Sequence, residues 1–159
     1  MNSLSMSPRP AASDDLEQIL SIEKLSYPEP WSSDHFIEEM QKTYARVLVL
    51  TDDETDTVVS AYIIYWVQAE GVSLLNVAVN PKWRGLGFAK KLMSVMINEA
   101  VREEIPRIIL EVREGNLDAL SMYEKIGFKK TGARKSFYSN GDTAIIMELK
   151  TSDIDTMIQ

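Results

Sequence analysis

The sequence contains no cysteine and only one histidine, His35. The lack of cysteine excludes disulfide bonds, zinc knuckles and a thiol nucleophile. A single histidine without a paired ligand argues against a metal site, so we expect no bound metal and interpret His35 as a surface residue. Any catalytic chemistry must come from other residue types.

Long apolar runs and an excess of basic residues are also missing. No segment approaches the roughly 20 apolar residues of a membrane span, and the first residues, MNSLSMSPRP, lack a basic-then-apolar signal pattern. With 17 basic and 24 acidic residues, the formal net charge is −7. This balance argues against a nucleic-acid partner and would suit a cationic substrate, although it also favours solubility. We expect a cytoplasmic protein with no membrane partner.

The length of 159 residues fits a single domain, which we place at residues 1–150, followed by a polar tail at 151–159. Hydrophobic periodicity predicts a mixed α/β fold in which helices cover both faces of a sheet. The predicted elements are strands at 4–9, 45–51, 58–67, 72–79, 107–113, 128–135 and 143–149, two helices between the first two strands, and helices at 89–101 and 117–126.

Serines mark the starts of the first two helices. Ser13 is expected to cap a helix that carries Leu25 on its apolar face. Either Ser32 or Ser33 is expected to open the second helix, with Ile37 turned inward.

Two glycines precede the clearest predicted helix. A strand ends at Val79, Pro81 turns the chain, and Gly85 and Gly87 lead into the helix near Ala89. The first helix amides and the helix dipole then point outward, and glycine lets a bulky anion approach the backbone, so a pyrophosphate fits this turn. From the glycines alone, a plain tight turn is an equally good interpretation.

Other nucleotide signatures are missing from this turn. It has no lysine followed by Ser or Thr, as in a P-loop, and the third glycine of the dinucleotide fingerprint is absent. Nucleoside triphosphate and NAD therefore fit poorly.

The turn resembles that of the GNAT acetyltransferases. Residues 84–89, Arg-Gly-Leu-Gly-Phe-Ala, match the family signature Arg/Gln-x-x-Gly-x-Gly/Ala between its fourth strand and third helix. The resemblance covers nearly the whole chain and is strongest to the ribosomal-protein-alanine N-acetyltransferase (RimI-like) group. The other shared residues are Pro30-Trp31-Ser32, Asn76 to Val79, Leu110 to Arg113, Asn116, Leu120, Met122, Tyr123, Glu124, Gly127, Phe128, Arg134, Tyr138 and Asp142 to Met147.

The resemblance implies a GNAT fold, a seven-stranded, mostly antiparallel twisted sheet with splayed central strands and about four helices on both faces. It also implies acetyl-CoA as co-substrate, with the amides of Val77 and Val79 facing the pantetheine arm. Asn116 fits a helix N-cap equally well, and the two roles are compatible. The implied cofactor-binding residues are Val77, Ala78, Val79, Arg84, Gly85, Leu86, Gly87, Phe88, Ala89, Lys90, Asn116 and Tyr123.

Glu111 is the candidate general base. It interrupts an apolar strand, and a carboxylate in such a place must be paired, solvated in a cleft or protonated. A structural ion pair with Arg113 or Arg84 is the alternative. In the resembling family, a glutamate at this position accepts a proton from the attacking amine, either directly or through water.

Tyrosine and tryptophan supply the remaining candidates. By pattern alone, Tyr123 beside Leu120 and Ile126 is more typical of a core residue, but the resemblance implies a general acid next to the coenzyme sulfur. It also implies that Trp31 and Tyr138 line the acceptor groove. A hydrophobic plug over the sheet is the alternative for Trp31, and an exposed aromatic is the alternative for Tyr138.

The leading hypothesis is an N-acetyltransferase that modifies a protein N-terminus, with the N-terminal alanine of a small-subunit ribosomal protein as the implied acceptor. Because one fold serves many acceptors, a small-molecule amine, a polyamine or a lysine side chain is the alternative. A non-catalytic CoA-binding regulatory module is a third hypothesis, which the presence of both Glu111 and Tyr123 disfavours. The sequence carries no indication of oligomeric state.

Overall fold

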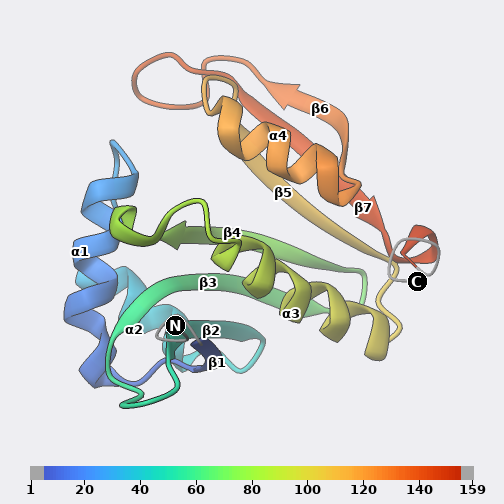
Figure 1. Cartoon of the computed structure of the whole chain (residues 1–159). Helices are drawn as coiled ribbons and strands as arrows, with labels where there is room; N and C mark the ends of the chain where they lie inside the picture. Colours follow the sequence, from blue (N-terminus) through green and yellow to red (C-terminus); the bar gives the residue numbers. More distant parts are fainter. Residues whose placement is uncertain (1–5, 155–159) are drawn as a thin grey trace. The chain divides into compact units, whose positions relative to one another are not determined.

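The computed structural model describes residues 6–154, which form two compact units. Within this range, the first unit comprises the chain up to Val67 together with Leu75–Asn98, and the second comprises Gln68–Leu74 and the chain from Glu99 onward. Figure 1 shows the elements coloured along the sequence. They are β1 (Met6–Pro10), α1 (Leu16–Ser26), α2 (Ser33–Gln41), β2 (Ala45–Asp52), β3 (Val59–Gln68), β4 (Gly71–Val79), α3 (Phe88–Arg102), β5 (Arg107–Arg113), α4 (Leu117–Ile126), β6 (Lys129–Arg134) and β7 (Ala144–Lys150).

The predicted mixed α/β fold is confirmed, with a seven-stranded sheet and four helices in the predicted order. The strands pair in the order β1-β2-β3-β4-β5-β7-β6. The pairs β1–β2, β2–β3, β5–β7 and β6–β7 are antiparallel, whereas β4 and β5 are parallel. The strand predicted at 4–9 is β1, and residues 4 and 5 lie outside the described range.

Strand β3 forms the centre of the first unit. Its side chains are buried from Val59 to Tyr65, as predicted for a strand covered on both faces. Helices α1 and α2 pack against alternate side chains of β2 and β3, which therefore share one face. This core contains Ile19, Ile22, Phe36, Val47, Val49, Val59, Tyr62, Ile64 and Ala78.

The prediction that Ser13 caps the first helix is wrong. For the second helix, Ser32 or Ser33 was expected at the start, and Ser32 is confirmed. Ser13 begins a short 3-10 helix, η2 (Ser13–Asp15), and Ala12 occupies the cap position. The Asp15 carboxylate accepts a hydrogen bond from the Ala12 N–H at 2.7 Å, and the cap position itself contributes no side-chain hydrogen bond. Ser32 caps α2, its hydroxyl accepting from the N–H of His35 at 3.1 Å.

The inner face of α1 also differs from the prediction. Leu25 is 65% exposed, because the buried positions of α1 are Ile19, Ile22 and Glu23. These positions recur at three and four residues, but the last of them carries a carboxylate that an apolar pattern does not detect. Ile37 of α2 was also expected to face inward and is 38% exposed.

In the second unit, β5 pairs with β7 along its length, and β6 adds to β7 on the other side. Figure 1 shows α4 running along these strands. Strand β5 buries alternate side chains, Ile108, Leu110 and Val112, and leaves Glu111 exposed. The predicted glycine end of α4 is confirmed, since Gly127 has a φ of 123°.

The predicted polar tail begins with ordered residues. Thr151–Asp153 form a short 3-10 helix, η4. The N–H of Thr151 donates to the Pro106 carbonyl at 3.0 Å, its hydroxyl donates to the Ile105 carbonyl at 2.7 Å, and Ile154 is buried. The remainder of the predicted tail, residues 155–159, lies outside the described range.

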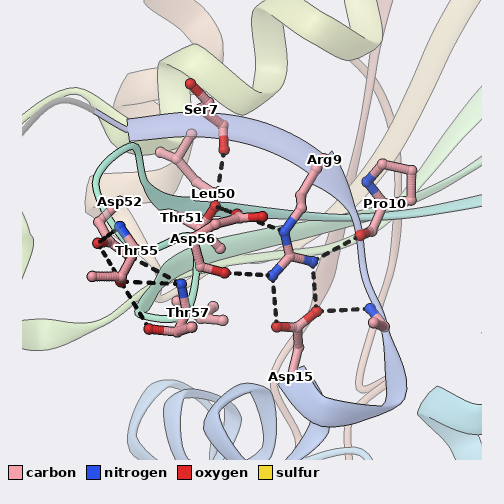
Figure 2. Close-up of polar contacts among 12 residues, drawn as sticks. Ser7, Arg9, Pro10, Asp15, Leu50, Thr51, Asp52, Thr55, Asp56 and Thr57 are labelled. Atoms are coloured by element: carbon pink, nitrogen blue, oxygen red, sulfur yellow. Dashed lines mark hydrogen bonds and ion pairs between the residues drawn. The ribbon is translucent and has the colours of Figure 1, made fainter.

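Arg9 joins the edge strand β1 to two other segments of the first unit (Figure 2). Its guanidinium donates to both carboxylate oxygens of Asp15, at 2.8 and 3.0 Å, and to Asp56 in the β2–β3 turn at 2.7 Å. The Thr51 hydroxyl donates to the same oxygen of Asp56 at 2.5 Å. Because Asp15 is buried, this paired geometry contributes to stability more than an exposed ion pair would.

The hydrogen bonds from Arg9 hold the pKa of Asp15 below its ordinary value of 3.8. A carboxyl whose pKa is lowered by folding stabilises the native state above its ordinary pKa, and this stabilisation is lost as the pH falls through the lowered value. We therefore expect Asp15→Asn to lower the free energy of unfolding by about 2 kcal/mol at neutral pH. In a chain of this size, that change lowers Tm by roughly 4–8 °C.

Thermal melts at several pH values check this expectation. The difference in Tm between wild type and Asp15→Asn should be constant above about pH 5 and shrink below about pH 4. Asp14→Asn, at the exposed neighbouring position, is the control and should melt like wild type. A difference that persists unchanged at acidic pH would contradict the role of Asp15.

Candidate active site

The turn between β4 and α3 presents backbone groups to an open space. Gly85 and Gly87 both have a φ of +82°, a left-handed conformation that other residues rarely adopt. A Cβ at either position would meet no atom within 4 Å. Since α3 begins at Phe88, its first amides and the positive end of its dipole lie at this turn. The turn therefore fits a bulky anionic group such as a pyrophosphate.

Three predicted cofactor residues of the first unit lie close together around this turn. The Arg84 side chain donates to the Val79 carbonyl and to the Ser26 hydroxyl, both at 3.4 Å. The Tyr27 hydroxyl donates to the Val77 carbonyl. The end of β4, the glycine turn and the end of α1 are thus neighbours.

Residues 27–32, which we call loop 27–32, connect α1 to α2 and carry Trp31. The Trp31 ring stacks on His35 with 3.7 Å between ring centroids and contacts Phe36 at 5.2 Å. It is partly buried and packs against the core under α1 and α2, a position that fits both the hydrophobic plug and a wall of the acceptor groove. His35 has a 43% exposed side chain, so it is a surface residue that also supports Trp31.

Glu111 lies on the exposed face of β5, with its side chain 34% exposed. One carboxylate oxygen is 3.6 Å from a guanidinium nitrogen of Arg134 in β6. The alternative interpretation of Glu111 was an ion pair with Arg113 or Arg84, and the partner that the structure gives is Arg134 instead. Strand β7 pairs with both β5 and β6, which brings Arg134 within reach of Glu111, whereas Arg113 is engaged elsewhere.

Arg113 holds the turn between β6 and β7. Its guanidinium carbon lies 3.7 Å from the centroid of the Tyr138 ring, and it donates to Asn140 at 3.2 Å and contacts Asp142 at 3.5 Å. Within the turn, the N–H of Tyr138 donates to the Asp142 carbonyl at 3.1 Å. Tyr138 is therefore fixed over the end of β5 by a cation–π contact.

Sequence analysis did not find these roles of Arg113 and Arg134. The available signal was the alternation of β5, which places Glu111 and Arg113 on one face. The partners of that face depend on the register of β6 and β7, which the sequence pattern does not define.

Helix α4 positions Asn116 and Tyr123. The Asn116 side chain accepts a hydrogen bond from the Ala119 N–H at 3.2 Å, which confirms the N-cap interpretation. Tyr123 is 6% exposed, and its ring meets Phe128 edge-on at 5.9 Å. This packing fits a core tyrosine and restrains the ring of Tyr123.

Among residues 6–154, no group of three or more acidic or histidine side chains could hold a metal ion. In the same range, no helix combines the length and hydrophobicity needed to span a bilayer.

Comparison with known proteins gives consistent results. The sequence model of the acetyltransferase (GNAT) family matches residues 16–128. A Bacillus subtilis protein, provisionally named ribosomal protein bS18-alanine N-acetyltransferase, is 31% identical over 136 residues, 84% of this chain and 88% of that protein. The ribosomal protein bS18-alanine N-acetyltransferase of Haemophilus ducreyi is 31% identical over 139 residues, 85% of this chain and 93% of its own. The crystal structure of the ribosomal-protein-S18-alanine N-acetyltransferase from Escherichia coli matches with a TM-score of 0.82 at 27% identity, covering 92% of this chain and 94% of that one.

The glycine turn can be tested by substitution. A non-glycine residue in the left-handed region costs about 1–2 kcal/mol, so Gly87→Ala should move the backbone away from its anion-binding geometry. We expect the Kd for coenzyme A to rise roughly tenfold, measured by calorimetry.

Gly132→Ala is the matched control. Its added Cβ would make only an ordinary contact with Ile146 at 3.5 Å, and Gly132 is not among the positive-φ residues. It should bind coenzyme A like wild type. Equal affinities in Gly87→Ala and wild type would rule the turn out as the diphosphate site.

Proposed function

Because the chain belongs to the acetyltransferase (GNAT) family, we propose that it acetylates the N-terminal α-amine of a protein. It is an acetyl-CoA-dependent N-acetyltransferase, and the proposed acceptor is the N-terminal alanine of a small-subunit ribosomal protein. Relatives named for alanine acetylation of ribosomal protein bS18 align over most of their own length, which supports this acceptor. A ribosomal acceptor would place the enzyme in the cytoplasm.

Acetyl-CoA binding rests on one observation, the pair of left-handed glycines at the start of α3 beside the end of β4. The backbone of residues 84–90 would hold the pyrophosphate, and the amides of Val77 and Val79 would face the pantetheine arm. Asn116 can keep its cap through the side-chain oxygen and offer its amide nitrogen to the coenzyme. Residues Ala78, Arg84, Leu86, Phe88, Ala89, Lys90 and Tyr123 complete the proposed cofactor contacts.

The reaction requires a neutral amine, a polarised carbonyl and a proton for the leaving sulfur. An α-amine has an ordinary pKa of about 8, so a modest base suffices near neutrality. Glu111 would take the amine proton, directly or through water, as the new N–C bond forms. The C–S bond then breaks, and the Tyr123 hydroxyl would return a proton to the sulfur. The N–H of Val79 or a neighbour would stabilise the oxyanion.

Two arginine contacts support these roles in the second unit. Arg134 beside Glu111 restrains the direction of the carboxylate. Arg113 beneath Tyr138 restrains the ring, whose hydroxyl would hydrogen-bond the backbone of the acceptor peptide. Trp31, held in loop 27–32, would form another wall of the acceptor site.

An acceptor panel tests the proposed function. The enzyme would be incubated with acetyl-CoA and short peptides that begin with alanine, the same peptides with a blocked N-terminus, lysine-containing peptides, and polyamines. We expect mass spectrometry to show acetylation of the alanine-starting peptides only when the N-terminus is unblocked. Preferential labelling of polyamines or lysine side chains would replace the proposed acceptor, and no labelling at all would favour a CoA-binding module.

The role of Glu111 has a separate test. Loss of a general base typically lowers the rate by about 10²–10⁴-fold, so Glu111→Gln should reduce kcat at least a hundredfold. The Kd for acetyl-CoA should remain within about twofold of wild type, because the diphosphate is held by backbone groups.

Glu114→Gln, at the exposed residue that follows β5, is the matched control and should keep wild-type kcat. Full activity of Glu111→Gln across the pH profile would remove Glu111 from the mechanism.

A further inference from the structure

Glu23 is a buried carboxylate that the proposed mechanism does not use. It lies on the inner face of α1, one residue after Ile22, and is 1% exposed. Burying a carboxylate costs several kcal/mol unless hydrogen bonds replace its hydration. An apolar side chain would suit this helix position better on packing grounds alone, so the groups that Glu23 binds must explain it.

The carboxylate of Glu23 accepts hydrogen bonds from three different segments of the first unit. One oxygen accepts from the Tyr62 hydroxyl of β3 and from the Asn76 side-chain amide of β4, the latter at 2.8 Å. The other accepts from the backbone N–H of Trp31 at 2.9 Å. Burial and the nearby Glu23 charge raise the pKa of Tyr62, so its hydroxyl remains protonated and donates.

The bond to Trp31 attaches loop 27–32 to the buried face of α1. Pro28 and Pro30 lack an N–H and cannot donate. At its first residue, the loop is attached by the Tyr27 N–H to the Glu23 carbonyl at 3.1 Å and by the Tyr27 hydroxyl to Val77. At its far end, the Trp31 N–H is attached to the Glu23 side chain. Glu23 therefore contributes an anchor to both ends of the loop.

A carboxylate has the chemistry that this position requires. Three donors converge on Glu23, and both terminal oxygens of its side chain can accept hydrogen bonds, whereas a side-chain amide has an acceptor on one terminal atom and donors on the other. A glutamine at the same place would turn its NH₂ group toward either the Trp31 N–H or the Tyr62 and Asn76 donors. One of these hydrogen bonds would then be lost or rearranged inside the core.

We propose that Glu23 is a positioning residue for the acceptor. By binding the Trp31 N–H and the Asn76 amide together, it fixes loop 27–32 relative to β4 and thereby sets the KM for the acceptor peptide. Glu23 acts through Trp31 and does not touch the reacting atoms. The inference rests on the proposed function, because it takes Trp31 as one wall of the acceptor site.

The test compares Glu23→Gln with Glu39→Gln. Glu39 of α2 is a matched control, since it is 2% exposed and accepts from the Trp66 indole at 2.7 Å and from Lys42 at 2.6 Å. Both substitutions should lower Tm by a similar amount. Only Glu23→Gln should raise the KM for the acceptor peptide, by roughly tenfold, with kcat and the Kd for acetyl-CoA within about twofold of wild type.

Hydrogen exchange of the Trp31 amide gives a second measurement that does not depend on activity. Its protection should fall in Glu23→Gln and remain at the wild-type level in Glu39→Gln. If Glu23→Gln does not fold, Tyr27→Phe removes the hydrogen bond from the loop to the Val77 carbonyl at a partly exposed position and should raise the same KM.

The outcomes separate this inference from the proposed function. A wild-type enzyme that acetylates no amine overturns the proposed function, and unchanged protection of Trp31 in Glu23→Gln would then still overturn the positioning role. An active wild type whose acceptor KM is the same in Glu23→Gln overturns the inference alone. Equal increases in KM for Glu23→Gln and Glu39→Gln would show general loosening of the fold and also overturn it.

Discussion

The first unit is organised by the requirement that a buried carboxylate must be fully hydrogen-bonded. Glu23 satisfies this requirement with donors from β3, β4 and loop 27–32. Because these donors come from segments far apart in the sequence, their convergence restricts where α1 can lie against the strands. The glycine turn follows directly from β4, so its placement depends on the same restriction.

The second unit uses a different kind of interaction. Glu111 is held by Arg134, whose side chain is 55% exposed, and an exposed ion pair of this kind is weak and adaptable. The glycine turn of the first unit, by contrast, is defined by backbone dihedral angles at Gly85 and Gly87. A backbone-defined turn for the proposed cofactor and an exposed ion pair at the proposed base are physically consistent with a fold that serves many acceptors.

Most of the fold was predictable from the sequence because strand and helix periods were clear. The apolar periodicity of α3 and the apolar run of β3 are examples in which a local pattern specifies both the element and its burial. The glycine turn was also predictable, since its left-handed residues had to be glycines. These features depend on residues close together in the chain.

The features that escaped prediction depend on long-range geometry. The pairing of Glu111 with Arg134 requires the register of three strands, and no local pattern defines that register. The inward position of Glu23 breaks the apolar pattern of α1, which led to Leu25 being placed inside instead. The signal present in the sequence was an acidic residue directly after Ile22, four positions beyond Ile19.

The glycine turn has one further consequence, which concerns protons. The turn would hold the diphosphate through main-chain amides, and these do not titrate. The affinity of this turn for the diphosphate, as proposed, should therefore not change with pH over the range in which an α-amine changes its charge. Any pH dependence of turnover would then originate in the acceptor amine and in the groups that exchange protons with it. Coenzyme binding would not contribute to it.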